Sequence, residues 1–208
     1  MTIQPTDVLI VIDLQVDFCP GGSLAVRDGN TIIPLINRLA MRFDHVVATQ
    51  DWHPQGHISF ASAHLGKQPF IDTVETPYGT QHLWPDHCVQ NSAGAALHPD
   101  LLIENLELIL RKGFRREIDS YSAFVENDKT TPTGLAGYLR ERNLRRLFFV
   151  GLAYDYCVGS SALDGQRLGF ECIVIEDATR GIAEDSQRTM RDRLDAAGVK
   201  SIQSNALA

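Results

Sequence analysis

Short apolar runs alternate along the chain with segments in which apolar side chains recur at helical spacing. This alternation is typical of a parallel sheet covered by helices on both faces. We therefore predict an α/β fold with three layers, α-β-α, around a mostly parallel six-stranded sheet. The predicted strands are Val8–Asp13, His45–Thr49, Leu106–Arg111, Arg146–Gly151, Glu171–Ile175 and Val199–Ile202, and the predicted helices are Thr31–Arg42, Thr133–Arg142, Cys157–Leu168 and Ser186–Ala197.

One long segment, Gln50 to Leu101, interrupts this pattern and is rich in His, Pro and Gly. An irregular excursion of this length in a compact domain usually serves function. No repeat, low-complexity tract or linker divides the rest of the chain. A length of 208 residues suits one domain, so we expect residues 1–208 to form a single unit.

Composition and charge narrow the classes of protein. The formal net charge of -7 argues against a nucleic-acid-binding surface. The apolar run Val8 to Ile12 is too short to span a bilayer, and the N-terminus does not resemble a targeting segment, so we expect no membrane partner. The four cysteines lie far apart without CxxC spacing, which predicts reduced thiols and a cytoplasmic protein. The sequence does not fix the oligomeric state, and a homo-oligomer remains open.

The residues best suited to chemistry fall where the predicted strands end. Asp13 ends the first strand, Asp51 follows the second, Lys112 follows the third, and Cys157 comes shortly after the fourth. Ligands of an open parallel sheet bind beyond the carboxyl ends of its strands. All four side chains are therefore expected at one edge.

Cys157 lies at a predicted helix start, where Asp155 is placed as an N-cap. The helix dipole and the free N–H groups there favour a thiolate, and the same N–H groups could hold an oxyanion. A small buried hydrophobe is the alternative for an isolated cysteine. Asp13 and Lys112 could form a structural salt bridge, or Asp13 could carry protons while Lys112 supplies a positive field.

Asp51 and His53, two residues apart on an extended segment, predict a divalent metal site together with His87. Asp, His and His with open positions suit zinc, iron or manganese. The role of His57 is left open: it could be a fourth ligand, a residue that supports the ligands, or a solvated loop residue. The metal could activate water, or it could hold a heteroaromatic amide, for which the flanking Phe18, Trp52, Trp84 and Tyr121 would form flat walls.

Seven segments together resemble the nicotinamidase/pyrazinamidase family of isochorismatase-like cysteine hydrolases. They are Asp13–Phe18, Pro20–Leu24, Thr49–Pro54, Trp84–Val89, Lys112–Gly113, Asp119–Phe124 and Gly151–Val158. The resemblance implies an isochorismatase-like hydrolase fold and hydrolysis of nicotinamide to nicotinate and ammonia through a Cys thioester, a step of NAD salvage. Pyrazinamide would be a second substrate.

The resemblance also implies roles for individual residues. It implies a triad of Asp13, Lys112 and Cys157, one metal ion on Asp51, His53 and His87, and a cis peptide at Leu152–Ala153. The N–H groups of Ala153 and Cys157 would form the oxyanion hole, and the substrate pocket would contain Phe18, Leu24, Trp84 and Tyr121. Tyr154 stands where a smaller residue such as Thr is frequent, which would narrow or reshape that pocket.

Two other readings remain at this point. The chain could be another isochorismatase-like amidohydrolase, acting on a different small amide, or an isochorismatase. It could also be a catalytically silent binding protein, because a fold does not establish a function.

Overall fold

The central sheet of the computed structural model, which describes residues 1–208, contains six strands in the order β5-β2-β1-β6-β7-β8. Every neighbouring pair is parallel, which confirms the predicted sheet. The strands are β1 (Asp7–Ile12), β2 (His45–Asp51), β5 (Leu106–Lys112), β6 (Arg146–Leu152), β7 (Glu171–Arg180) and β8 (Lys200–Ile202).

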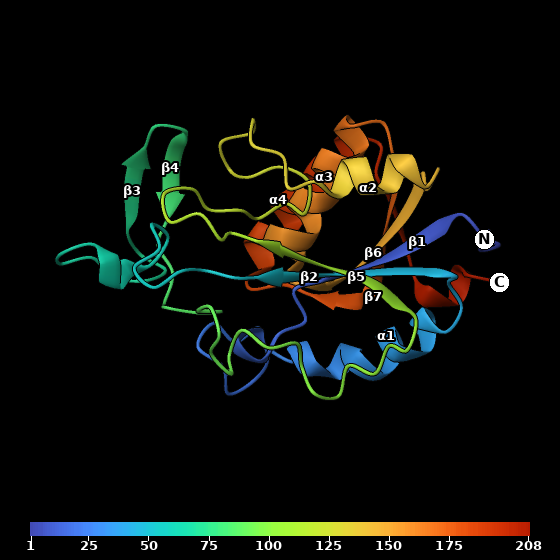
Figure 1. Ribbon diagram of the computed structural model, residues 1–208, viewed down its shortest axis with the longest axis horizontal. Coiled ribbons are helices and arrows are strands. Elements are labelled where there is room, and N and C mark those ends of the chain that lie inside the picture. The colour runs from blue at the N-terminus through green and yellow to red at the C-terminus, as the bar shows by residue number, and fades with distance from the viewer.

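Helices cover both faces of this sheet, as Figure 1 shows. Helix α1 (Ile33–Ala40) packs on one face, and α2 (Leu135–Glu141), α3 (Gly159–Arg167) and α4 (Glu184–Ala196) pack on the other. Strand β1 contributes Leu9 and Val11 to the core under α1, and Val8, Ile10 and Ile12 to the opposite core. This alternation of side chains along a fully buried strand gives the three layers.

The excursion between β2 and β5 contains a hairpin that the sequence did not predict. Strands β3 (Thr73–Thr76) and β4 (Gly79–His82) pair antiparallel and project away from the main sheet (Figure 1). Their residues are mostly exposed or half-buried, so they lack the apolar alternation by which a strand is recognised. The remaining short elements are the 3-10 helices Val16–Phe18, Gly29–Ile32, Ala61–Ala63 and Ser204–Ala206 and a π-helical turn, η4 (Tyr154–Val158).

The close approach of β1 and β6 determines where the turn after β6 lies. Gly151 has φ +110°, and a Cβ atom there would stand 2.1 Å from the carbonyl oxygen of Ile12. Only glycine fits such a position. The strand end before Asp13 and the turn that leads to Cys157 are therefore held side by side.

None of the helices combines the length and the apolar content that crossing a bilayer requires.

Candidate active site

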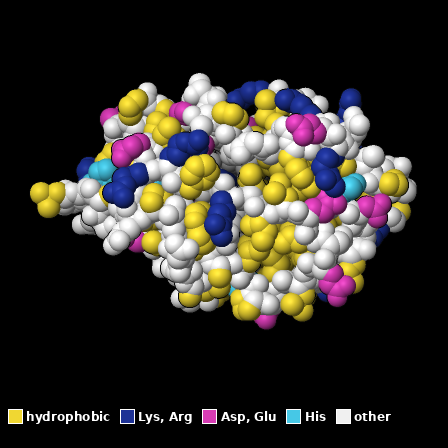
Figure 2. Space-filling model, in the orientation of Figure 1, with side chains coloured by type: hydrophobic (Ala, Val, Ile, Leu, Met, Phe, Trp, Pro, Cys, Tyr) yellow, Lys and Arg dark blue, Asp and Glu magenta, His cyan; other side chains and the backbone are white.

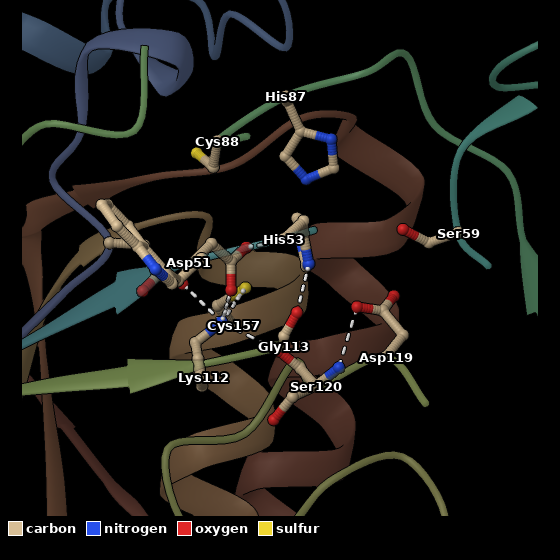
Figure 3. Close-up of polar contacts among 12 residues, drawn as sticks. Asp51, His53, Ser59, His87, Cys88, Lys112, Gly113, Asp119, Ser120 and Cys157 are labelled. Atoms are coloured by element: carbon tan, nitrogen blue, oxygen red, sulfur yellow. Dashed lines mark hydrogen bonds and ion pairs between the residues drawn. The ribbon is translucent and has the colours of Figure 1, made fainter. Parts of the chain in front are cut away.

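Lys112 lies at the centre of the four strand-end residues, as Figure 3 shows for three of them. Its Nζ atom is 2.8 Å from Asp13 Oδ2 and 3.5 Å from Cys157 Sγ, and it also pairs with Asp51 Oδ1. All four residues are buried, although they come from four separate strand ends. The edge expected from the strand pattern is where the structure places them.

The two carboxylates keep the buried lysine charged. Burial by itself would lower the pKa of Lys112, but the charges of Asp13 and Asp51 outweigh it and hold that pKa well above its ordinary value. The lysine in turn bridges the triad and the predicted metal ligand Asp51. Sequence spacing gave no sign of this bridge.

Asp13 is arranged as a proton acceptor. Burial raises the pKa of Asp13 to about 6, although the Lys112 ammonium opposes the rise. Thr49 Oγ1 donates to Asp13 Oδ1 over 2.6 Å. Asp13 Oδ2 forms an ion pair with the Lys112 ammonium over 2.8 Å, and because a carboxylate oxygen has a second lone pair, it can still receive a proton.

The surroundings of Cys157 oppose the thiolate that the predicted helix start was expected to favour. Burial raises the pKa of the Cys157 thiol well above its ordinary value; Lys112 opposes this, whereas Asp13 and Asp51 add to it. Cys157 also lies in the π-helical turn η4, before α3 begins. A thiol in these surroundings would need a base to take its proton before it could act as a nucleophile.

Asp155 was expected to cap the helix that carries Cys157, and this expectation is wrong. Its carboxylate accepts hydrogen bonds from the N–H groups of Ile182 and Ala183 and from the Ser186 hydroxyl, at the start of α4. The residue thus joins the turn that carries Cys157 to the next helix. The peptide between Leu152 and Ala153 is cis, as the resemblance implies.

Asp51, His53 and His87 each offer one ligand atom, and these atoms lie within 4.8 Å of one another. The Nδ1 atoms of His53 and His87 are hydrogen-bonded to the backbone carbonyls of Gly113 (2.8 Å) and Pro85 (2.7 Å). Both Nε2 atoms are then left to bind an ion, which is the usual arrangement of metal-ligating histidines. The donor set fits a divalent metal.

His57 is buried, so its interpretation as a solvated loop residue is wrong. Its ring stacks on His53 with centroids 4.2 Å apart, and its nitrogens approach Ser59 Oγ (2.8 Å) and the carbonyl oxygen of Ile118 (3.3 Å). Both nitrogens already have protein partners, which favours a supporting role over ligation. Burial, together with the neighbouring His53, lowers the pKa of His57 to about 4.

Asp119 is a residue of this site that sequence reasoning did not single out. It is buried, and its carboxylate lies within 4.8 Å of ligand atoms of His53 and His57. Its position within the segment Asp119–Phe124 was the available signal, but spacing alone does not tell which way a side chain points.

A small pocket opens at Cys157. It is lined by the predicted residues Phe18, Leu24, Asp51, His53, Trp84, His87, Tyr121, Ala153 and Cys157, and also by Asp119, Tyr156 and Ile182. Aromatic rings form much of its wall: the Tyr156 ring stands 5.0 Å from Trp84 and 5.6 Å from Tyr121, centroid to centroid. Such walls suit a flat ring.

Two aromatic residues lie elsewhere than expected. Trp52 is outside the pocket, where its ring is covered by the Arg111 guanidinium at 3.8 Å. Tyr154 packs in the core beneath the α2–α4 layer, with its ring 5.8 Å from the Arg191 guanidinium. Tyr154 therefore does not narrow the pocket wall.

Comparisons with known proteins agree with this geometry. The Isochorismatase domain model matches residues 7–206. The nicotinamidase of Acinetobacter baylyi is 53% identical over 94% of this chain and 92% of its own length. Among solved structures, PnC1 from L. infantum in complex with nicotinate is 41% identical with a TM-score of 0.88, covering 100% of this chain and 98% of that one. The pyrazinamidase of Pyrococcus horikoshii in complex with zinc is 35% identical with a TM-score of 0.78, covering 96% and 99%.

The family model matches nearly the whole chain, and one nicotinamidase is 53% identical over the aligned residues. The chain therefore belongs to the nicotinamidase/pyrazinamidase family of isochorismatase-domain proteins.

Proposed function

We propose that this protein is a nicotinamidase, which hydrolyses nicotinamide to nicotinate and ammonia for NAD salvage and also accepts pyrazinamide. The observation that carries the proposal is the placement of the Cys157 thiol, against Lys112 and Asp13, at a narrow pocket with aromatic walls. The similarity to the Acinetobacter baylyi nicotinamidase and to the nicotinate complex of L. infantum supports the choice of a small pyridine amide.

The chemistry begins with proton transfer from the Cys157 thiol to Asp13. The sulfur attacks the amide carbon, and the N–H groups of Ala153 and Cys157, which line the pocket, stabilise the oxyanion. Asp13 returns its proton to the leaving nitrogen, so ammonia departs and a thioester remains. Asp13 then takes a proton from water, and the hydroxide attacks the thioester. The carbon–sulfur bond breaks, the proton on Asp13 returns to the Cys157 sulfur, and the product leaves as the carboxylic acid, which ionises to nicotinate.

Lys112 keeps its charge through these steps. It stabilises the transient negative charge on sulfur and orients the Asp13 carboxylate, with which it pairs. Asp51, His53 and His87 would hold one divalent ion, zinc or else iron or manganese, which would supply Lewis-acid chemistry to the pocket when bound. The zinc complex of the Pyrococcus horikoshii pyrazinamidase supports this assignment.

The alternatives explain fewer observations. A catalytically silent binding protein has no need of a buried base, a buried cation and a thiol in contact. An isochorismatase characteristically lacks the cysteine nucleophile, and neither isochorismatases nor carbamoyl-amide hydrolases are characterised by an Asp-x-His pair with a distal His.

Release of ammonia and nicotinate from nicotinamide, measured with wild type and Cys157→Ala, tests the proposal. We expect turnover by wild type and a loss of at least about a thousandfold in the variant, because the nucleophile is gone. Circular dichroism should show a retained fold, since alanine fits the small buried site.

Cys172→Ala is the matched control, because Cys172 is equally buried but lies in the core away from the pocket. It should keep its turnover per folded molecule. Near-normal turnover by Cys157→Ala would contradict the thiol mechanism, and turnover of isochorismate in place of nicotinamide would contradict the substrate.

A further inference from the structure

Gln81 connects the projecting hairpin to the pocket. It is the buried residue of strand β4, only 2% exposed, whereas its neighbours Thr80 and His82 are exposed. Gln81 is thus a buried polar side chain that points inward from a mostly exposed hairpin, and such a side chain requires hydrogen-bond partners.

The hydrogen bonds of Gln81 fix the orientation of its amide. Its Nε2 atom donates to Asp119 Oδ2 and to the carbonyl oxygen of His82, both over 2.9 Å. A carboxylate and a carbonyl only accept, so the nitrogen, not the oxygen, must face them. The same Nε2 atom lies 3.2 Å from the Tyr121 hydroxyl.

Tyr121 is therefore surrounded by donors. The Trp84 indole Nε1–H also donates to its hydroxyl oxygen, over 3.2 Å, and neither an indole N–H nor the Gln81 nitrogen can accept a hydrogen bond. The Gln81 amide has two hydrogens for three acceptors, so one of them is shared with the hydroxyl oxygen, and the hydroxyl's own hydrogen finds no acceptor in either neighbour. Tyr121 lines the pocket, so that hydrogen is free to point toward a bound molecule.

We propose that Gln81 is a positioning residue that, together with Trp84, makes the Tyr121 hydroxyl a hydrogen-bond donor to an acceptor atom of the bound substrate. The inference rests on the proposed function in taking this substrate to be a pyridine amide, which carries two acceptors, the ring nitrogen and the carbonyl oxygen. A ligand that presents a donor at the same place would meet the hydroxyl hydrogen and bind poorly.

A double-mutant cycle between Gln81 and Tyr121 tests the proposal. Tyr121→Phe removes the donor and keeps the ring, and we expect the KM for nicotinamide to rise roughly five- to tenfold. Gln81→Glu offers the hydroxyl an acceptor, which turns its hydrogen away from the pocket, so a rise of similar size is expected. Gln81→Met removes one donor without offering an acceptor, and should raise KM by about threefold.

The decisive result is the double variant. If Gln81 acts through the Tyr121 hydroxyl, both Gln81 substitutions should leave KM unchanged in the Tyr121→Phe background. The proposal would be overturned if the factors by which the Gln81 and Tyr121 substitutions raise KM simply multiply in the double variant. It would also be overturned if Tyr121→Phe alone leaves KM unchanged. Thr80→Ala, an exposed change in the same strand, is the control and should leave KM as in wild type.

Failure of the proposed function would appear separately, as wild type that releases no ammonia from nicotinamide.

Neutron diffraction of wild-type crystals tests the orientation of the Tyr121 hydroxyl without any turnover. A hydroxyl deuterium directed into the pocket supports the proposal, and one directed toward Gln81 overturns it.

Discussion

Burial raises the pKa of the Asp13 carboxyl and the pKa of the Cys157 thiol. Both groups therefore favour their protonated forms more than they would in water, and this affects how the thiol can react. A thiol that stays protonated at rest needs a base within reach, and a carboxylate whose pKa is about 6 is a better match for a thiol than an ordinary aspartate. Lys112 stabilises both states of the pair, because its positive charge balances the negative charge whether that charge lies on Asp13 or on the Cys157 sulfur. In the proposed mechanism, the proton passes from the thiol to Asp13 as the sulfur attacks.

The rate of the reaction should fall in acid as Asp13 becomes protonated. The base must be ionised to accept the thiol proton, so kcat/KM should rise with pH through a midpoint near the Asp13 pKa of about 6 and then level off. Below the midpoint we expect about a tenfold loss for each unit of pH. Steady-state rates between pH 4.5 and 8, compared with circular dichroism to exclude unfolding, provide the measurement. A profile that stays flat down to pH 5 would show that Asp13 is not the base.

Individual residues also show which features of the site could be predicted from the sequence. Strand-end placement was sufficient to gather Asp13, Asp51, Lys112 and Cys157, because parallel strands end at a common edge. It did not reveal that Lys112 pairs with both aspartates, or that Asp119 faces the histidines. Nor did it show that Tyr154 points into the core. Those facts depend on side-chain direction, which spacing in the sequence does not determine.

At the scale of elements, the turn η4 and helix α4 act together. The N-cap position of α4 is Ala183, which has no side-chain acceptor, and Asp155 supplies one from the neighbouring turn. Ile182, whose N–H also binds Asp155, lines the pocket. The turn that carries Cys157 and one pocket wall are thus joined by a single carboxylate. The sequence predicted the helix and the acid but assigned the acid to the wrong helix.

Asp155→Ala should therefore affect both stability and binding. Loss of the cap leaves the N–H groups of Ile182 and Ala183 without their acceptor, which we expect to cost about 2 kcal/mol in the free energy of unfolding. The KM for nicotinamide should rise as Ile182 shifts. Urea unfolding and steady-state rates measure the two effects.

Asp185→Ala is the control for this change, because its side chain is 93% exposed and pairs only with Arg188 on the surface. It should alter stability by no more than a few tenths of a kcal/mol. Equal destabilisation by the two substitutions would remove Asp155 from its capping role.

At the scale of the whole molecule, the sheet separates two cores, and the excursion after β2 closes over the edge where the strands end. Figure 2 shows the outside of this arrangement, with apolar side chains exposed near the front edge of the sheet, among scattered charges. The layers were predictable because apolar periodicity reports burial. The β3–β4 hairpin was not, because its residues are polar and its place is determined by contacts such as that of Gln81 with Asp119.

We propose that residues 1–208 unfold as one domain. Both tryptophans, Trp52 and Trp84, lie in the excursion, so fluorescence reports that segment, whereas far-ultraviolet circular dichroism reports the sheet and helices. The two probes should give the same urea midpoint, because Asp51, His53 and Lys112 join the excursion to the sheet. A fluorescence transition at clearly lower urea would mean that the excursion unfolds separately.

The central claim is that Cys157 bonds covalently to the substrate carbon. Rapid acid quenching of the enzyme during turnover of nicotinamide, followed by peptide mass spectrometry, measures this most directly. The account predicts a nicotinoyl group on the peptide that contains Cys157, and none on those that contain Cys19, Cys88 or Cys172. Full turnover with Cys157 unmodified throughout, or with the acyl group on another residue, would contradict it.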